Sequence, residues 1–149
     1  MKSKGEKEEK YIKIDPTTYA GFLVWQTSNN WERFVNSQLL VNSINQSELF
    51  HMIGLSWLTK ENKLLTQASL SRFVGTTSMN TSKILKKLES LGYVSRKVGT
   101  DVRSNSISLT EKGNRIVMES AKNLDATEEK YYPREGKKEF ISYLKKLKK

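Results

Sequence analysis

The segment 78–91 places amide, hydroxyl and ammonium groups along one face of a predicted helix. That face holds Asn80, Lys83, Lys86 and Lys87, and the opposite face holds Thr81, Ile84, Leu85, Leu88 and Leu91. When such a helix lies in the major groove of B-DNA, Asn can bond adenine and Lys can reach guanine or a phosphate. Its first half usually meets base edges and its second half the backbone. We predict base or phosphate contacts for Asn80, Ser82 and Lys83, and phosphate contacts for Lys86 and Lys87.

The charge of the surrounding sequence favours this interpretation over a simpler one. Lysines on an amphipathic helix are often only its solvated face. Residues 60–103, however, carry nine Lys or Arg and three acidic residues, within a chain of 149 residues whose net charge is +10. Such a surplus favours a polyanionic partner, because neutralised phosphates release their counterions. Charge alone does not indicate sequence-specific binding.

A β-hairpin is predicted directly after this helix. The segments 93–98 and 106–109 alternate and contain β-branched residues, and the polar loop 99–105 closes the hairpin. A hairpin beside a recognition helix can lie along the duplex and insert an Arg into a narrow minor groove, so we predict this contact for Arg103. Asp101 is acidic beside phosphates, and we predict that it forms the turn or a salt bridge that orients Arg103.

Capping residues predict two longer helices before this region. Asp15 and Pro16 are typical of a helix start, and the helix that they begin extends to about residue 40. It is apolar on more than one side, so it needs more than one packing surface. Asn45 and Glu48 have the spacing of a capping box, for a helix that ends near residue 59.

Thr66 caps a shorter helix, which Gly75 ends. This helix and the segment 78–91 together have the outline of a helix-turn-helix. We add Thr66, which caps the first helix, Ser78 at the start of the second and Arg96 in the hairpin to the predicted DNA contacts.

Two helices are predicted after the hairpin. Thr110 caps the first, which extends to about residue 131, and Pro133 ends it. A basic helix then covers about 135–147, whereas residues 1–13 are predicted to be a flexible charged tail.

Composition excludes several kinds of site. The chain has no Cys and one His, which excludes disulfides, thiolate metal sites and a multi-histidine site. The longest apolar run, 21–25, is too short to span a bilayer, and the first residues do not resemble a signal peptide. The sequence contains no recognisable catalytic pair of a nucleophile and a general base, and no glycine-rich phosphate-binding loop. We expect no enzyme, metal or cofactor and no membrane contact, and a cytoplasmic, nucleoid-associated location.

Short motifs over about 64–117 give a family resemblance. They are Thr66–Leu70, Gly75, Lys87–Glu89, Gly92–Val94, Arg96, Asp101–Ser104 and Leu109–Gly113. Their order and spacing resemble those of MarR-type winged-helix regulators, of which the D-x-R wing followed by L-T-x-x-G is the most diagnostic part. The resemblance implies a mainly α fold with a small β-hairpin wing, in a single domain covering 1–149.

The resemblance also implies a role for each segment of the chain. Residues 15–44 and 111–149 would be dimerisation helices, and 45–110 the winged helix-turn-helix lobe. The homodimer would bind a palindromic operator in double-stranded DNA, with helix 78–91 in the major groove and wing 94–109 in the minor groove. Regulators of this type repress transcription and less often activate it. A small ligand would release the protein from its operator.

Aromatic side chains are candidates for a ligand pocket between the dimerisation helices and the winged helix-turn-helix lobe. The candidates are Trp25, Trp31, Phe34, Phe50, His51 and Trp57, which would bind a small aromatic or phenolic ligand. The alternative is that the aromatic residues are plain core and that His51 is structural. A second functional class also stays open, a nucleic-acid-binding architectural or plasmid-maintenance protein without an effector.

Overall fold

The computed structural model describes residues 15–39, 43–61, 65–97 and 106–148. Within these ranges it contains six helices and a two-stranded hairpin. In chain order they are α1 (Ala20–Gln38), α2 (Gln46–Lys60), α3 (Gln67–Val74), α4 (Ser78–Ser90), β1 (Val94–Lys97), β2 (Ser106–Leu109), α5 (Glu111–Tyr131) and α6 (Lys137–Leu147). The mainly α fold with a small hairpin is therefore confirmed. No helix in the described ranges combines the length and the apolar content needed to cross a membrane.

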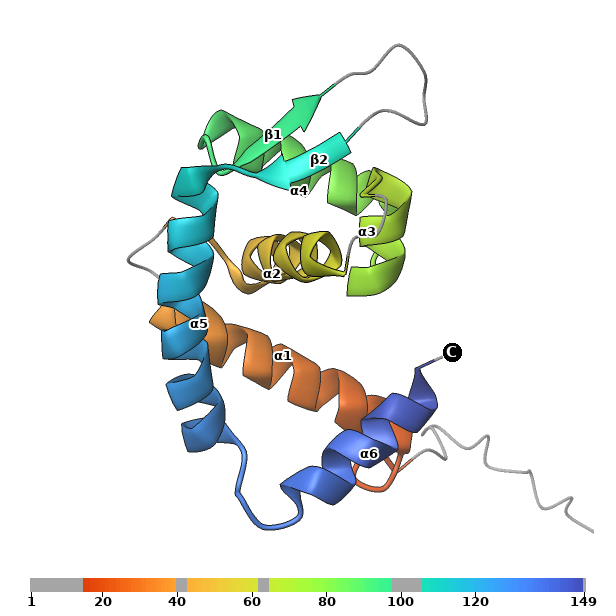
Figure 1. The fold of residues 1–149 in the computed structure, drawn as a ribbon. Helices are drawn as coiled ribbons and strands as arrows, with labels where there is room; N and C mark the ends of the chain where they lie inside the picture. Colours follow the sequence, from red (N-terminus) through yellow and green to blue (C-terminus); the bar gives the residue numbers. More distant parts are fainter. Residues whose placement is uncertain (1–14, 40–42, 62–64, 98–105, 149) are drawn as a thin grey trace, which may run out of the picture.

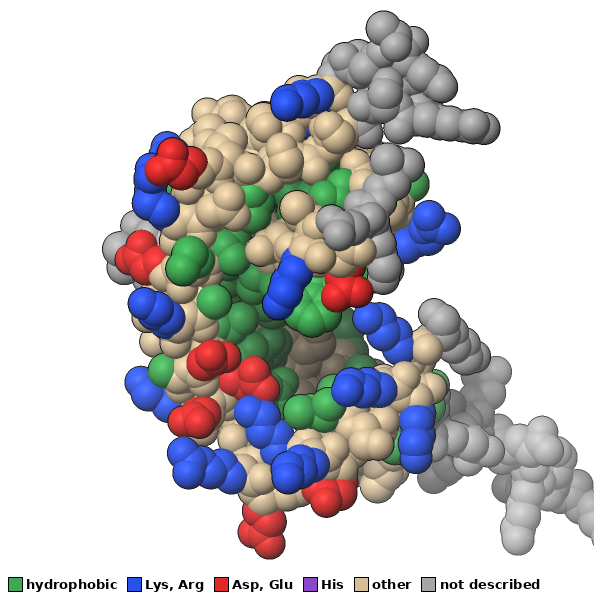
Figure 2. Space-filling model, in the orientation of Figure 1, with side chains coloured by type: hydrophobic (Ala, Val, Ile, Leu, Met, Phe, Trp, Pro, Cys, Tyr) green, Lys and Arg blue, Asp and Glu red, His purple; other side chains and the backbone are tan. Residues whose placement is uncertain are grey.

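The helices divide the molecule into two ends, which α5 connects (Figure 1). One end is a lobe formed by α2, α3, α4 and the hairpin, referred to below as the winged-helix lobe. The other end contains α1 and α6, which lie against each other. Figure 2 shows a hollow between the two ends, with hydrophobic side chains on its walls.

Side-chain caps begin the helices of the lobe as predicted. The Asn45 side chain accepts a 2.9 Å hydrogen bond from the Glu48 amide, and the Glu48 carboxylate accepts one of 3.0 Å from the Asn45 amide. The Thr66 and Thr110 hydroxyls accept hydrogen bonds from the third amide of α3 and α5. Gly75 adopts a left-handed conformation with φ of 79° and ends α3. These local interactions satisfy the amides that a helix start leaves without partners.

The predicted start of α1 is wrong. The Asp15 carboxylate accepts hydrogen bonds from the hydroxyl and the amide of Thr17, and these lower the pKa of the carboxyl. Asp15 therefore stabilises a tight turn over 16–18 rather than a helix. The helix begins at Ala20, after the extended residue Tyr19, which makes no side-chain cap.

The core lies between the helices of the lobe and includes Val35 near the end of α1. Leu49, Met52 and Leu55 of α2 are fully buried against Leu70 of α3 and the apolar side of α4. Tyr93, Val94, Ile107 and Val117 extend the same cluster to the hairpin and α5. The hairpin therefore packs on the core that holds α4.

The hairpin has an antiparallel register in which Val94 pairs with Leu109 and Lys97 pairs with Ser106. Where α5 leaves the hairpin, Gly113 lies against the backbone of Tyr93, and a Cβ at this position would collide with the Tyr93 carbonyl oxygen. The glycine of the L-T-x-x-G motif is therefore needed for the close approach of α5 to the hairpin.

Candidate nucleic-acid interface

Helix α4 has the two faces that its sequence predicts. Thr81, Ile84, Leu85 and Leu88 are buried, whereas Asn80, Lys83, Lys86 and Lys87 are exposed and Ser82 is half-buried. Burial of the apolar face in the lobe leaves the polar face outward, because the two repeat with the period of the helix. The outward face is referred to below as the α4 face.

The beginning of α4 is held by polar side chains of the preceding turn and of α3. The Thr77 hydroxyl caps the helix by accepting from the Asn80 amide at 3.2 Å. The Asn80 side chain donates to the Thr76 hydroxyl at 3.0 Å. Gln67, which belongs to the motif 66–70 but is not among the predicted contacts, donates from Nε2 to the carbonyl and the hydroxyl of Ser78, both at 3.1 Å. Ser78 and Asn80 therefore already have partners within the helix-turn-helix.

Thr66 and Gln67 stand together at the start of α3. The Thr66 hydroxyl serves as the cap of α3, which sets the direction of that helix. Gln67 follows it and reaches across to α4. The sequence signals at Gln67 are its place next to a cap and its membership of the motif 66–70, and neither identifies a partner eleven residues away.

Lys87 is tied to the interior of the lobe. Its Nζ lies 2.6 Å from Oε1 of Glu48, a buried side chain that also completes the cap of α2. A carboxylate out of contact with water needs a cation or several donors close to it. Lys87 supplies that charge, although 49% of its own side chain stays exposed.

His51 lies fully buried between α2 and α4. Its Nδ1 is 2.6 Å from the Ser47 carbonyl, and its Nε2 is 3.2 Å from the Thr81 hydroxyl. A carbonyl only accepts, so Nδ1 carries the proton and the Thr81 hydroxyl donates to Nε2. Burial lowers the pKa of His51, against opposing effects of the Ser47 carbonyl and of Glu48. The side chain therefore ties α4 to α2 in its neutral form.

The hairpin is joined to α4 by charge. Nε of Arg96 in β1 lies 3.0 Å from Oε2 of Glu89 in α4. Lys112 at the start of α5 donates to the Leu91 carbonyl at 2.9 Å, just beyond the end of α4, where a cation is favourable. Arg103 and Asp101, the predicted minor-groove contact and its orienting partner, lie outside the described residues.

The predicted pocket residues occupy several different places. Trp31 contributes, with Val24, Tyr132, Phe140 and other residues, to a largely apolar cavity of about 360 Å³ between α1 and α6. Trp25 and Trp57 are exposed, and Phe50 is half-buried. Both ring nitrogens of His51 are engaged by Ser47 and Thr81. Of the predicted pocket residues, Trp31 thus lines this cavity.

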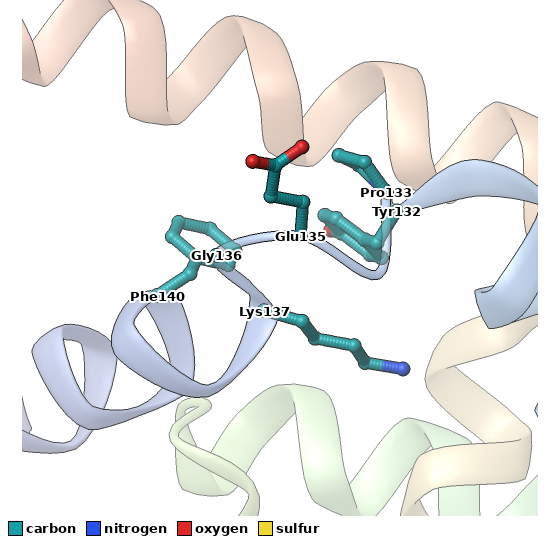
Figure 3. A pocket seen from close by; sticks show the side chains of 6 residues that line it. All are labelled: Tyr132, Pro133, Glu135, Gly136, Lys137 and Phe140. Atoms are coloured by element: carbon teal, nitrogen blue, oxygen red, sulfur yellow. The ribbon is translucent and has the colours of Figure 1, made fainter.

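A smaller pocket lies at the turn between α5 and α6 (Figure 3). Tyr132 and Phe140, whose ring centroids are 5.9 Å apart, form its apolar part. The Lys137 side chain extends away from the Glu135 carboxylate and forms an ion pair with Glu128 at 2.9 Å. Burial raises the pKa of the Tyr132 hydroxyl, and Tyr131 and Glu128 raise it further. These contacts hold α6 to α5.

In the described parts of the chain, no group of three or more acidic or histidine side chains is placed to hold a metal ion.

Comparisons with known proteins agree with this geometry. Residues 40–113 match the family of winged helix DNA-binding domains. The chain is 29% identical, over 134 residues, to YdcH of Bacillus subtilis strain 168, an uncharacterized helix-turn-helix-type transcriptional regulator. This alignment covers 89% of the chain and 91% of that protein. Residues 40–113 therefore form a winged helix DNA-binding domain, and the chain has the fold of MarR family regulators.

Solved structures show how much of the chain shares this fold. The complex of Staphylococcus aureus MepR with DNA superposes with a TM-score of 0.74 at 20% identity, covering 87% of the chain and 96% of MepR. CouR of Rhodococcus jostii RHA1, bound to p-coumaroyl-CoA, gives a TM-score of 0.74 at 18% identity. It covers 89% of the chain and 92% of CouR, so the similarity extends well beyond the lobe.

Proposed function

We propose that the regulator is a homodimeric repressor that binds a palindromic operator. Each protomer would place α4 in the major groove of one half-site and the wing, 94–109, against the neighbouring minor groove. The protein would act at the bacterial nucleoid. The single observation that carries the proposal is the α4 face, an exposed polar and cationic surface on a helix whose other side is fixed in the core.

The charges of this face are suited to a duplex. Lys83 and Lys86 are exposed and lie on adjacent turns of α4, from which ammonium groups can reach phosphates on both sides of a groove. Arg96 lies in β1 beside α4, at the base of the wing. The proposal gives Arg103 the minor-groove contact and Asp101 the role of orienting it.

The other end of the molecule supports a dimer. Helix α6 has no buried residue, and large apolar side chains of α6 are exposed: Phe140, Ile141, Tyr143, Leu144 and Leu147. Helix α1 likewise exposes Phe22, Leu23, Val24 and Trp25. Apolar surface of this extent is unusual on a monomer, and burying it in a second copy would be favourable. The segments 15–44 and 111–149 would then form the dimer.

A small aromatic or phenolic ligand is the proposed effector. The hydrophobic hollow in Figure 2 and the cavity beside Trp31 offer apolar surface for a ring. CouR, a protein of the same fold, was solved with p-coumaroyl-CoA. All three Trp residues of the chain lie in α1 and α2, so their fluorescence during titration with p-coumarate or salicylate tests this part of the proposal.

Selection of bound fragments from genomic DNA tests the main proposal. We expect a palindrome with half-sites about one helical turn apart, and binding at least about 10³-fold tighter than to competitor DNA at the same salt. Uniform binding to all fragments would instead indicate an architectural or plasmid-maintenance protein without an effector.

Variants of the α4 face and the wing make the test specific. Lys86→Ala removes one proposed phosphate contact and should therefore reduce the dependence of log affinity on log salt by roughly one. Arg103→Ala should weaken operator binding by more than about 1 kcal/mol while the dimer persists. Lys60→Ala, which removes an exposed lysine at the end of α2, is the control and should leave affinity and salt dependence unchanged. Unchanged affinity and salt dependence in Lys86→Ala would contradict the phosphate contact proposed for this residue.

A further inference from the structure

One apolar side chain is exposed near the beginning of the α4 face. Met79, the second residue of α4, is 76% exposed. Its sequence neighbours, Ser78 and Asn80, are polar and have partners within the helix-turn-helix. The core gains almost nothing from a side chain so exposed, so packing does not explain an apolar residue at this position.

The position of Met79 on the helix is central to the α4 face. Lys83 and Lys86 follow it by four and seven residues, the spacing of side chains on one stripe of a helix. The buried residues Ile84, Leu85 and Leu88 occupy the opposite side. Met79 therefore stands on the lysine stripe, one turn closer to the beginning of the helix.

We propose that Met79 is a specificity-determining residue that contacts the 5-methyl group of thymine in the major groove. The inference rests on the proposed function, because it requires α4 to enter that groove. The first residues of such a helix meet base edges, and the lysines behind Met79 supply the charge that holds it against DNA.

The chemistry of the groove selects one base. Each base pair presents hydrogen-bonding groups in the major groove, and thymine adds an apolar group there, its methyl. Met is unbranched, flexible and polarizable, so it can follow the methyl through small changes of helix position. Contact with the methyl removes apolar surface of both groups from water. Met79 thus gives the complex a preference for thymine that neither lysine supplies.

Operator duplexes with deoxyuridine in place of thymine test the contact. This replacement removes the 5-methyl group and keeps the base pairing and every hydrogen-bonding group in the groove. With the operator obtained by selection, replacement of the contacted thymine should weaken wild-type binding by about fourfold for each methyl removed. Replacement of thymines elsewhere in the operator should have no effect.

Variants of the protein assign the preference to one side chain. Met79→Ala should bind thymine and uracil duplexes equally, while Met79→Leu, which keeps an apolar group, should retain much of the preference. Lys86→Ala is the matched control and should weaken binding to both duplexes by the same factor. Circular dichroism should show the same helix content in all of these proteins.

The outcomes separate this inference from the function on which it rests. Absence of any selectively bound sequence would overturn the proposed function and this inference with it. An operator bound equally with thymine or uracil by the wild type would overturn the inference alone. A preference that persists in Met79→Ala would assign the methyl contact to another residue. Unchanged operator affinity of Met79→Ala would also overturn the inference.

Discussion

The winged-helix lobe and the α1–α6 end of the molecule differ in how completely one chain buries their apolar residues. In the lobe, Leu49, Leu70 and Leu85 have no exposed surface. In α6 no residue is buried, and its large apolar side chains are all more than a third exposed. One chain alone completes the core of the lobe. The other end leaves exposed the apolar surface that the proposed dimer would cover.

Helix starts differ in the same way between the two regions. Helices α2, α3 and α4 each begin with a side chain that accepts a hydrogen bond from the first turn, and α5 does so as it leaves the hairpin. Helices α1 and α6 have no such side-chain cap. Local interactions thus support the lobe and the start of α5, while α1 and α6 depend more on what packs against them.

Removal of residues 134–149 should have the largest effect. It deletes α6, so we expect loss of the dimer and, because two linked half-sites are no longer engaged together, a loss of operator affinity of at least about 100-fold. Analytical ultracentrifugation measures the first effect and operator titration the second. A well-folded dimer after the deletion would place the interface elsewhere.

Two substitutions examine the same surface in the complete chain. Ile141→Asp together with Leu144→Asp should also give monomers, because it places charge on the exposed apolar side of α6. Lys145→Ser together with Lys146→Ser changes the same helix without touching its apolar residues, and this protein should remain a dimer.

The neighbouring lysines of α4 should separate stability from DNA binding. Lys87→Ala leaves the buried Glu48 carboxylate without its cation and should lower the free energy of unfolding by about 1–3 kcal/mol. Lys86→Ala should change it by less than about 0.5 kcal/mol, because Lys86 is exposed. Urea unfolding measures both changes. Equal effects on stability would contradict the role of Lys87 as the partner of the buried Glu48 carboxylate.

The smallest expected effect is a loss of stability in mild acid. His51 is neutral in the fold and its pKa is lowered by burial, so the unfolded chain binds the proton more readily below the ordinary value of about 6.5. Stability that is present above this pH should therefore decline as the pH falls toward the pKa of the folded state. Glu48, which faces the ring, opposes this decline by favouring the charged form.

Urea midpoints at about pH 7.5 and about pH 5.5 measure the decline, within a range in which carboxylates titrate little. His51→Gln removes the group that titrates, so the difference between its two midpoints should be smaller than in the wild type. An equal difference in the two proteins would show that another group is responsible.

Most helix boundaries of the lobe follow from short stretches of sequence. Asn45 and Thr66 were predicted as caps and Gly75 as a helix end, and all three predictions are confirmed. Each depends on groups within a few residues, so the sequence contains both partners of the interaction. The start of α1 was mispredicted because the Asp15 carboxylate can cap a turn as well as a helix, and local sequence does not distinguish the two.

The sequence was sufficient to predict the α4 face, since the helical period places its lysines opposite its leucines. It did not indicate which lysine forms an ion pair with a buried carboxylate. Lys87 and Glu48 are 39 residues apart, and His51 and Thr81 are 30 apart. Both contacts exist because α2 packs against α4, and only the packed structure brings such distant side chains within hydrogen-bonding distance.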